Sequence, residues 1–237
     1  MIGNRRRMRF GKPWLYRAAS YEQLLQAARP LHWWKLNEVS GVTALDYGTG
    51  SALNLTHTNG PVVNQNPIAV DGRAVSYDGV NDHSSVSTAA ITAPPFSVEM
   101  LFRATAVATG TVQTLLKVGN SVNTGFRIVL NGASTTLAYI QDGSGITSGV
   151  HGTTMLAATN YHMVLTTSAA GVANFYVNFA LTSLSGLGTF QTPASLTRLG
   201  LWSDGSRPFG GTLQHVAIFD RVLSDSEISQ RFYATGG

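Results

Sequence analysis

The chain has 237 residues, no cysteine and 43% hydrophobic residues, so it can bury a substantial core without disulfide bonds. Only 12% of its residues are charged, whereas 25 are glycine, a balance that favours strands and tight turns over solvent-facing helices. The net charge of +4 suggests a nucleic-acid partner, but its distribution along the chain excludes a uniformly basic protein.

The positive charge is concentrated at the start of the chain. Residues 1–30 contain seven basic residues and one acidic residue, whereas residues 31–237 contain nine basic and eleven acidic residues. A nucleic-acid-binding domain needs a basic stripe or patch on its folded surface. Because the remainder of the chain is slightly acidic, we do not expect nucleic acid to be a partner.

Basic and apolar side chains are interleaved in the segment RRRMRFGKPWLY. Arginines alone would suit phosphate groups, but apolar side chains that would otherwise be exposed are typical of a protein contact. We therefore predict that residues 1–30 form a basic and aromatic arm with a short docking helix, and that the arm anchors the chain to a larger assembly. The anchoring residues are expected to be Arg5, Arg6, Arg7, Arg9, Phe10, Trp14 and Tyr16.

Targeting segments are not evident. A secretory signal needs an apolar stretch of roughly 7–15 residues, and none precedes Pro30. No run is long enough to span a bilayer, so we expect neither a signal peptide nor a membrane contact. An arginine-rich, acid-poor start leaves a mitochondrial presequence as a minor alternative.

Two short helices are predicted, near residues 20–29 and 224–233. Ser20 with Gln23, and Ser224 with Glu227, have the spacing of a capping box, and Pro30 ends the first helix. The apolar sides of these helices are expected to be Leu24, Leu25 and Ala28 in the first, and Ile228 and Phe232 in the second. We expect the first helix to dock the arm onto the body.

Between the helices, apolar residues alternate with polar ones. The segment FSVEMLFR places Phe96, Val98, Met100 and Phe102 on one face and Ser97, Glu99 and Arg103 on the other. The segments GFRIVLNG, YHMVLTTS and NFYVNFAL alternate in the same way, and turn-forming clusters such as NGAS and QDGSG separate them. The pattern predicts an all-β, antiparallel two-sheet sandwich that forms one domain over residues 31–237.

The order of the motifs resembles a known family. HWWKLNEVSG, LDYGTG, RAVSYDGVNDHSSV and RLGLWSDGSRPFGGTLQHVAIFDRVLSDSEI resemble signatures of the LamG-like, or concanavalin A-like lectin/glucanase, superfamily of laminin G and pentraxin-type jelly rolls. The resemblance covers nearly all of residues 31–233. It implies a two-sheet jelly roll whose edge loops bind glycans or protein partners, sometimes with calcium.

The chain departs from the family pattern where acidic residues are usual. Asn178 and Phe179 stand where an Asp-Gly turn is common, and Gln214 and His215 occupy frequent acidic positions. Calcium needs six to eight oxygen ligands, and aspartates in DYG, YDG and ND segments more often form turns. We predict no metal and no cofactor, with calcium left as an alternative. The carboxylates considered for it are Glu38, Asp46, Asp78 and Asp82.

No catalytic constellation emerges, and we predict that the chain is not an enzyme. The glucanases of the superfamily carry closely spaced carboxylates on one strand, whereas the strand FSVEMLFR carries Glu99 alone. Glu99 is expected to pair with an arginine such as Arg103 or Arg127. His162 and His215 lie in strand-like segments, where a hydrogen-bonded structural imidazole is expected.

The ligand-binding residues are sought among exposed aromatic and polar side chains. Trp202 stands in a polar turn and is the best candidate for a platform on which a sugar ring stacks. The candidate binding residues are Trp202, Asp204, Arg207, Asn81 and Asp82. Trp33 and Trp34 are adjacent, so one is expected in the core and the other outside or against the first helix.

A basic arm joined to a lectin-like sandwich resembles accessory proteins of tailed-bacteriophage virions. We predict a multi-copy virion structural protein, such as a capsid decoration protein, tail fibre or adaptor, assembled in the host cytoplasm. Its partners would be other virion proteins through residues 1–30 and a host-surface glycan or protein through the sandwich. The alternatives are a free-standing cellular lectin or adhesion domain and, less favoured, a divergent glycoside hydrolase.

Overall fold

The computed structural model describes residues 18–69, 71–121, 124–133, 135–141, 147–168, 172–187 and 189–236. The predicted anchoring residues Arg5, Arg6, Arg7, Arg9, Phe10, Trp14 and Tyr16 lie outside the described residues. The anchoring role of the arm therefore stays a prediction.

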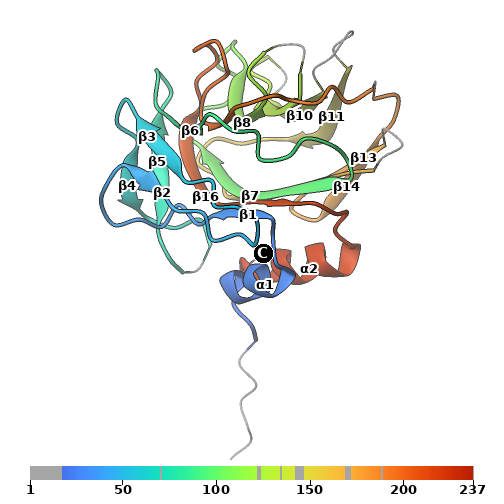
Figure 1. The fold of residues 1–237 in the computed structure, drawn as a ribbon, viewed down its shortest axis with the longest axis horizontal. Coiled ribbons are helices and arrows are strands. Elements are labelled where there is room, and N and C mark those ends of the chain that lie inside the picture. Colours follow the sequence, from blue (N-terminus) through green and yellow to red (C-terminus); the bar gives the residue numbers. More distant parts are fainter. Residues whose placement is uncertain are drawn as a thin grey trace, which may run out of the picture.

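The described chain forms a sandwich of two antiparallel sheets, which confirms the predicted fold class (Figure 1). The first sheet has the order β14 (Ala180–Leu184), β13 (Ala173–Val177), β12 (Tyr161–Thr167), β7 (Phe96–Ala104), β16 (Gly210–Phe219), β5 (Ala74–Asp78) and β4 (Val62–Gln65), with β1 (His32–Trp34) also paired to β16. The second sheet has the order β11 (Thr147–Thr154), β10 (Thr136–Gln141), β9 (Phe126–Leu130), β8 (Gln113–Val118), β15 (Thr197–Leu199), β6 (His83–Val86), β3 (Leu55–Thr58) and β2 (Thr43–Ala44).

The alternation in β7 shows how the sequence builds the layers. Phe96, Val98 and Met100 point into the main core between the sheets, as the period of two requires. Leu101 points to the outer face of the first sheet and belongs to a second core cluster. The outer face is therefore not a solvent face, because two helices cover it (Figure 1).

The two predicted helices are confirmed. Helix α1 (Tyr21–Ala28) has Ser20 as its N-cap, and α2 (Asp225–Ala234) has Ser224, each with the expected capping box. Tyr21 and Leu25 are fully buried against the first sheet, so Tyr21 joins the expected apolar side of α1. Neither described helix has the length and apolar character needed to cross a membrane.

The adjacent tryptophans separate as predicted. Trp34 lies in the main core between the sheets, and its indole Nε1 donates to the Leu53 carbonyl at 2.7 Å. Trp33 lies in the outer cluster with Tyr21 and Leu25 of α1. The pair therefore links both cores through β1.

The departures from the family pattern have structural roles. Asn178 and Phe179 form the two-residue loop between β13 and β14, both with positive φ (47° and 64°), a conformation that favours glycine. The Phe179 ring packs against Phe232 of α2, with ring centres 6.4 Å apart. Buried Gln214 accepts hydrogen bonds from the backbone N–H groups of Ile68 and Ala69 at 2.7 and 2.9 Å, which fastens that loop to β16.

Candidate functional site

Three basic side chains form a row on the outer face of the second sheet. Arg198 of β15 pairs with Lys117 of β8, and Lys117 pairs with Arg127 of β9. Directly paired residues of antiparallel strands project from the same face. The neighbouring residues point into the core between the sheets: Leu116, Val118, Phe126, Ile128 and Leu199. The three cations therefore face outward, side by side on adjacent strands.

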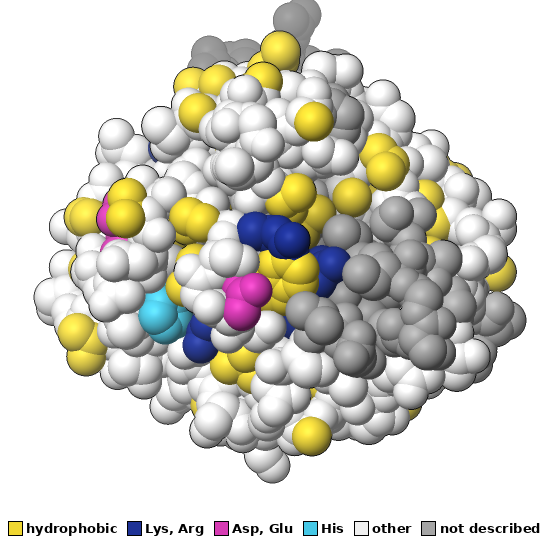
Figure 2. All heavy atoms as spheres, turned by 90° about the horizontal axis from the view of Figure 1, so that it is seen from above, with side chains coloured by type: hydrophobic (Ala, Val, Ile, Leu, Met, Phe, Trp, Pro, Cys, Tyr) yellow, Lys and Arg dark blue, Asp and Glu magenta, His cyan; other side chains and the backbone are white. Residues whose placement is uncertain are grey.

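The loop that follows β15 folds back over this row. The Trp202 ring lies between two guanidinium groups, with Arg127 3.9 Å and Arg207 3.3 Å from the ring centre. At such distances each face of the indole accommodates one guanidinium, so Trp202 is clamped between a strand residue and a loop residue. Figure 2 shows a group of Lys and Arg side chains on the face seen from above, around a hollow that contains hydrophobic atoms and an acidic side chain.

Local hydrogen bonds hold the loop in place. The Trp202 N–H donates to the Ser206 carbonyl and the Gly205 N–H donates to the Trp202 carbonyl, both at 3.1 Å. Asp204 accepts from the Ser206 hydroxyl at 2.6 Å and from its N–H at 2.8 Å. These bonds from Ser206, with a contribution from the nearby Arg207 charge, lower the pKa of Asp204. The loop therefore presents Asp204 as a carboxylate.

Arg198 connects the row to the loop. Its Nη1 donates to the carbonyls of Trp202 and Ser203, at 2.9 and 3.4 Å. Burial lowers the pKa of Arg198, although the charge of Asp204 opposes this effect. The buried Nε of Arg198 has no hydrogen-bond partner among the described residues. The Nε atom is shielded from solvent, so the fold bears the cost of an unpaired donor here.

Three of the predicted binding residues come together in this hollow. Trp202, Asp204 and Arg207 share the loop, but Trp202 is only 4% exposed and both ring faces are covered. This differs from the open stacking platform expected from the sequence, because guanidinium groups occupy the positions that a sugar ring would take. Trp202 instead positions Arg127 and Arg207 by stacking.

Asn81 and Asp82 lie in the turn between β5 and β6. The Asp78 carboxylate accepts from the N–H groups of Val80, Asn81 and Asp82, and Asp82 accepts from the Asp78 N–H at 3.0 Å. Asp82 is buried, and this turn stands beside a pocket of about 250 Å³ lined by Asp78 and threonines. These bonds hold Asn81 and Asp82 in their own turn, and the Asp82 carbonyl borders Gly200 at the base of the loop that carries Trp202.

The basic row was missed by sequence reasoning. Lys117, Arg127 and Arg198 lie in three strands separated by up to 81 positions, and only the strand register makes them neighbours. Each residue alone reads as an ordinary polar position of an alternating strand. The available signal was a basic residue at an outward position in each of three strands.

Another pocket, of about 390 Å³, lies between β12 and the C-terminal end of α2. Its polar lining is already engaged: Asn160 donates to the Ile68 carbonyl, Asn178 accepts from the His162 N–H, and the His162 Nε2 contacts Glu99. No Lys, Arg, Asp or Glu is among the described residues that line it. The hollow on the second sheet is therefore the stronger candidate site.

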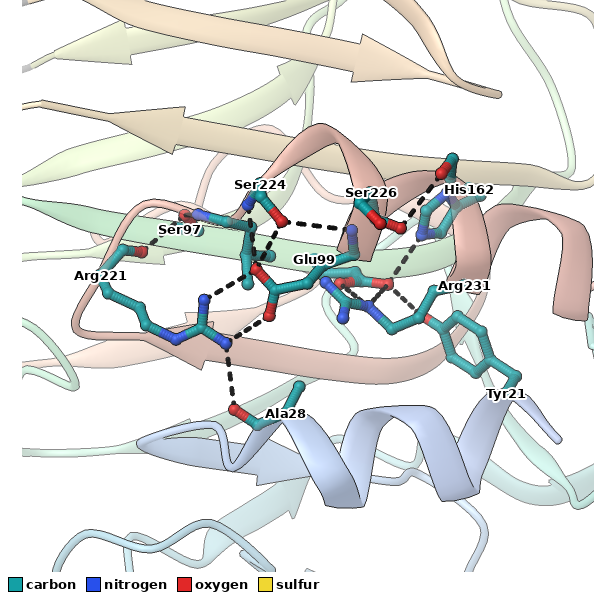
Figure 3. A network of polar contacts seen from close by, with 12 residues as sticks. Tyr21, Ala28, Ser97, Glu99, His162, Arg221, Ser224, Ser226 and Arg231 are labelled. Carbon is teal, nitrogen blue, oxygen red and sulfur yellow. Dashed lines mark hydrogen bonds and ion pairs between the residues drawn. The ribbon is translucent and has the colours of Figure 1, made fainter. Parts of the chain in front are cut away.

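Glu99 is the carboxylate that a glycosidase would have to use, and Figure 3 shows it enclosed by partners. The Arg231 Nε donates to both carboxylate oxygens at 2.8 and 3.0 Å, the His162 Nε2 lies at 2.8 Å, and the Tyr21 hydroxyl donates at 2.9 Å. Burial alone would raise the pKa of Glu99, but these partners together lower it. The predicted pairing with an arginine is confirmed.

The predicted identity of that arginine is wrong, because the sequence suggested Arg103 or Arg127. Arg103 donates to Asn160 at 3.4 Å, and Arg127 lies on the other sheet against Trp202. The partner, Arg231, comes from α2, and only the packing of that helix on β7 brings it to Glu99. Long-range pairs of this kind cannot be found by looking along one strand.

The two strand histidines differ. His162 is a hydrogen-bonded structural imidazole, as predicted. The prediction for His215 is wrong, because neither ring nitrogen has a hydrogen-bond partner within the described part of the chain. The ring packs against Tyr21 and Trp33, and burial lowers its pKa to about 4. His215 is therefore a neutral packing residue at physiological pH.

The other candidate calcium ligands hold loops. Asp46 accepts from the N–H groups of Trp33, Gly48 and Leu53 and contacts the His32 Nδ1 at 2.7 Å. Glu38 accepts from a backbone N–H of the same loop region. Within the described ranges, no three His, Asp or Glu side chains are grouped as a metal site. The aspartates act as turn formers.

The two-sheet order and the two outer helices define a lectin-like jelly roll. A family model described as the concanavalin A-like lectin/glucanases superfamily, Laminin G type, matches residues 78–229, so the chain belongs to this superfamily. The resemblance predicted from the motifs is thereby confirmed. No curated protein matches the chain.

Solved structures show the same fold at low sequence identity. The receptor-binding domain of botulinum neurotoxin mosaic serotype C/D is 13% identical, with a TM-score of 0.67 over 86% of this chain and 50% of that one. The ligand-binding domain of botulinum neurotoxin serotype D in complex with N-acetylneuraminic acid is 13% identical, with a TM-score of 0.68 over 86% of this chain and 50% of that one. Trypanosoma rangeli sialidase in complex with sialic acid is 16% identical, with a TM-score of 0.62 over 86% of this chain and 33% of that one. The chain spans half or less of these proteins, and the likeness establishes the fold alone.

Proposed function

We propose that this protein is a non-enzymatic binding and display module that recognises a glycan in the hollow around Trp202. The observation that carries the proposal is the clamped loop, in which Trp202 fixes Arg207 over the outward face of the second sheet. Rigid polar groups around a hollow lower the entropy cost of ordering on binding. Proteins of the same fold that were solved in complex with sialic acid or N-acetylneuraminic acid support a sugar as the ligand class.

The state of Glu99 supports a binding role over glycoside hydrolysis. Hydrolysis of a glycosidic bond needs two carboxylates that reach the sugar. Glu99 has an exposed fraction of 0% and is bonded to three side chains, so substrate cannot reach it without unpacking both helices.

The tether belongs to the same proposal. Residues 1–30 anchor the module to a larger, multi-copy assembly, and a tailed-phage virion with a capsid decoration protein, fibre or adaptor is the setting that the arm composition favours. Helix α1, which ends this segment, packs on the outer face of the first sheet, whereas the hollow lies on the second (Figure 1). A tether through α1 leaves the hollow on the side away from the assembly.

A glycan array tests the binding role with a matched pair of variants. Arg207→Ala removes the loop guanidinium over Trp202, whereas Arg73→Ala removes an exposed arginine beside β5 of the other sheet. We expect Arg207→Ala to reduce the signal of the bound glycans at least tenfold and Arg73→Ala to leave it unchanged, with equal melting temperatures. Binding that survives Arg207→Ala would refute the assignment of this site.

A free-standing cellular lectin is the second candidate, since the hollow does not depend on the arm. The two candidates agree on glycan binding and differ on what residues 1–30 do. Deleting residues 2–17 separates them, because only the tethered module needs the arm.

A further inference from the structure

We propose that His215 makes the docking of helix α1 sensitive to acid, so that α1, with the arm that precedes it, detaches from the first sheet as the pH falls. His215 is a buried imidazole without hydrogen-bond partners among the described residues, and it lies under the helix that joins the arm to the sandwich (Figure 1). Because it lies on the outer face of the first sheet, away from the hollow, this device is independent of the ligand.

A β-bulge in β16 turns His215 toward the helix. Leu213 points into the main core, so strict alternation would send His215 there as well. The pairing of β16 with β7 shifts its register between Gln214 and Ala217, and His215 has a φ of 52°. The shift places His215 on the outer face, where its ring centre lies 5.3 Å from that of Tyr21 in α1. Bulges commonly redirect a side chain in this way.

The docked helix leaves no place for a charged imidazole. His215 is 1% exposed, and neither ring nitrogen has a hydrogen-bond partner within the described residues. Burial lowers its pKa from 6.5 to about 4, and the Lys35 charge acts in the same direction. The carboxylates of Glu22 and Glu99 oppose this effect without outweighing burial. The ring must therefore be neutral while α1 is docked.

The two carboxylates that act on His215 are already paired. Glu22 of α1 forms an ion pair with Lys35, which follows β1, at 2.6 Å. Glu99 of β7 pairs with Arg231 of α2 at 2.8 Å, and the His162 Nε2 of β12 lies 2.8 Å from it. A protonated His215 would therefore find no unoccupied counter-ion on these elements, and it would gain more from contact with water.

Helix α1 is small enough to detach as a unit. The burial of Tyr21 and Leu25 holds it on the sheet, together with the hydrogen bond from the Tyr21 hydroxyl to Glu99 (Figure 3). The Ala28 carbonyl accepts from Arg221 at 3.3 Å. Burial raises the pKa of Tyr21, so this hydroxyl stays neutral in acid. An isolated helix of eight residues is unstable in water, so detachment would expose its backbone amides.

The two states of the helix fix the sign and the range of the pH effect. With α1 detached, the His215 ring meets water and titrates near its ordinary pKa of 6.5, whereas in the docked state its pKa is about 4. Docking is therefore fully favoured above pH 6.5 and loses stability as the pH falls from 6.5 toward 4. Between about pH 7 and pH 5, the ratio of detached to docked helix should rise roughly tenfold to twentyfold.

Hydrogen exchange of the backbone amides tests this device on the full chain. Protection would be measured at about pH 7 and pH 5 and corrected for the intrinsic exchange rate. We expect the amides of α1 to lose about tenfold in protection at the lower pH, whereas those of β7 and β16 keep theirs. Unchanged protection of α1, or an equal loss in the helix and both strands, would overturn the proposal.

Variants assign the effect to the imidazole. His215→Asn suits the positive φ, and His215→Phe keeps an aromatic ring against Tyr21. Each removes the titrating group, so the protection of α1 should become nearly independent of pH. If one variant fails to fold, the other and the wild-type profile carry the test.

His57→Asn is the matched control. Burial also lowers the pKa of His57, but this residue lies in β3 of the second sheet. The wild-type response of α1 should therefore persist in His57→Asn. A response that survives in a folded His215 variant, or one that disappears in His57→Asn, would show that another group controls the helix.

Discussion

Glu99 of β7 connects three other elements, the two helices and the neighbouring strand β12, through one buried carboxylate. Tyr21 comes from α1, His162 from β12 and Arg231 from α2. Breaking a buried ion pair leaves an uncompensated charge and costs about 3–5 kcal/mol. We therefore predict that Glu99→Gln lowers the free energy of unfolding by about this amount, measured by urea denaturation.

The control for this prediction is Glu22→Gln. Glu22 forms an ion pair with Lys35 at 2.6 Å near the surface, and such pairs contribute about 0–1 kcal/mol. Tyr21→Phe removes one hydrogen bond to Glu99 and should fall between the two. Equal stability of Glu99→Gln and Glu22→Gln would show that the network does not hold the helices.

Glu227 predicts how stability depends on pH. Arg221 binds it in a bidentate manner at 2.6 and 2.9 Å and, with Ser224, lowers its pKa from 4.5 to about 2. A carboxylate with a lowered folded pKa stabilises the protein above the unfolded value, and this stabilisation is lost as pH falls through the folded value. The difference in melting temperature between wild type and Glu227→Gln should therefore shrink as pH falls from 4.5 to about 2. A difference that stays constant over this range would contradict the prediction.

At the scale of elements, the loop from 200 to 208 depends on a glycine at its base. Gly200 has a φ of 85°, and a Cβ there would lie 2.7 Å from the Tyr77 ring and 3.1 Å from the Asp82 carbonyl oxygen. Gly205, at the tip, has a φ of 84° with nothing within 4 Å. In both alanine variants the left-handed backbone conformation lowers the free energy of unfolding by about 1–2 kcal/mol. In Gly200→Ala, overpacking against Tyr77 lowers it by a further 1–3 kcal/mol, roughly.

We predict that Gly200→Ala is less stable than Gly205→Ala and that it alone weakens ligand binding in the hollow. The physical reason is that Tyr77 lies in the packed core, so the loop base must shift and carry Trp202 with it. Denaturation and glycan binding of the two variants, measured together, check this. A Gly205→Ala variant with the greater loss would place the constraint at the loop tip instead.

The sequence predicts those elements that depend on residues close together along the chain. The capping boxes at Ser20 and Ser224 and the alternation of β7 need only neighbours within a few residues, and each is confirmed. The pairing register between strands is not local, because it depends on segments that are far apart in the sequence. The row of Arg198, Lys117 and Arg127 and the pairing of Glu99 with Arg231 arise only when distant strands and helices are placed. The predicted site therefore contained the loop but not the strand residues beneath it.

On the scale of the whole molecule, the two sheets have different outer faces. The first is covered by α1 and α2 and sealed by an apolar cluster, whereas the second carries the cationic hollow (Figures 1 and 2). A module attached through its covered face and binding through the other can do both at once. This division implies that attachment and recognition are separable by mutation.

The arm gives the most direct test of that separation. Residues 18–236 include both sheets, both helices and the hollow, so deleting residues 2–17 should leave the melting temperature and glycan affinity unchanged. The same deletion should abolish co-sedimentation with the native assembly, because the segment contributes five arginines and a cluster of aromatic side chains.

Replacing Arg5, Arg6, Arg7 and Arg9 by glutamine removes these charges and keeps the apolar residues of the arm. A purely ionic anchor would be lost in this variant as well, whereas a mixed anchor would retain salt-resistant association. Unchanged co-sedimentation after the deletion would refute the tether and favour a free-standing lectin.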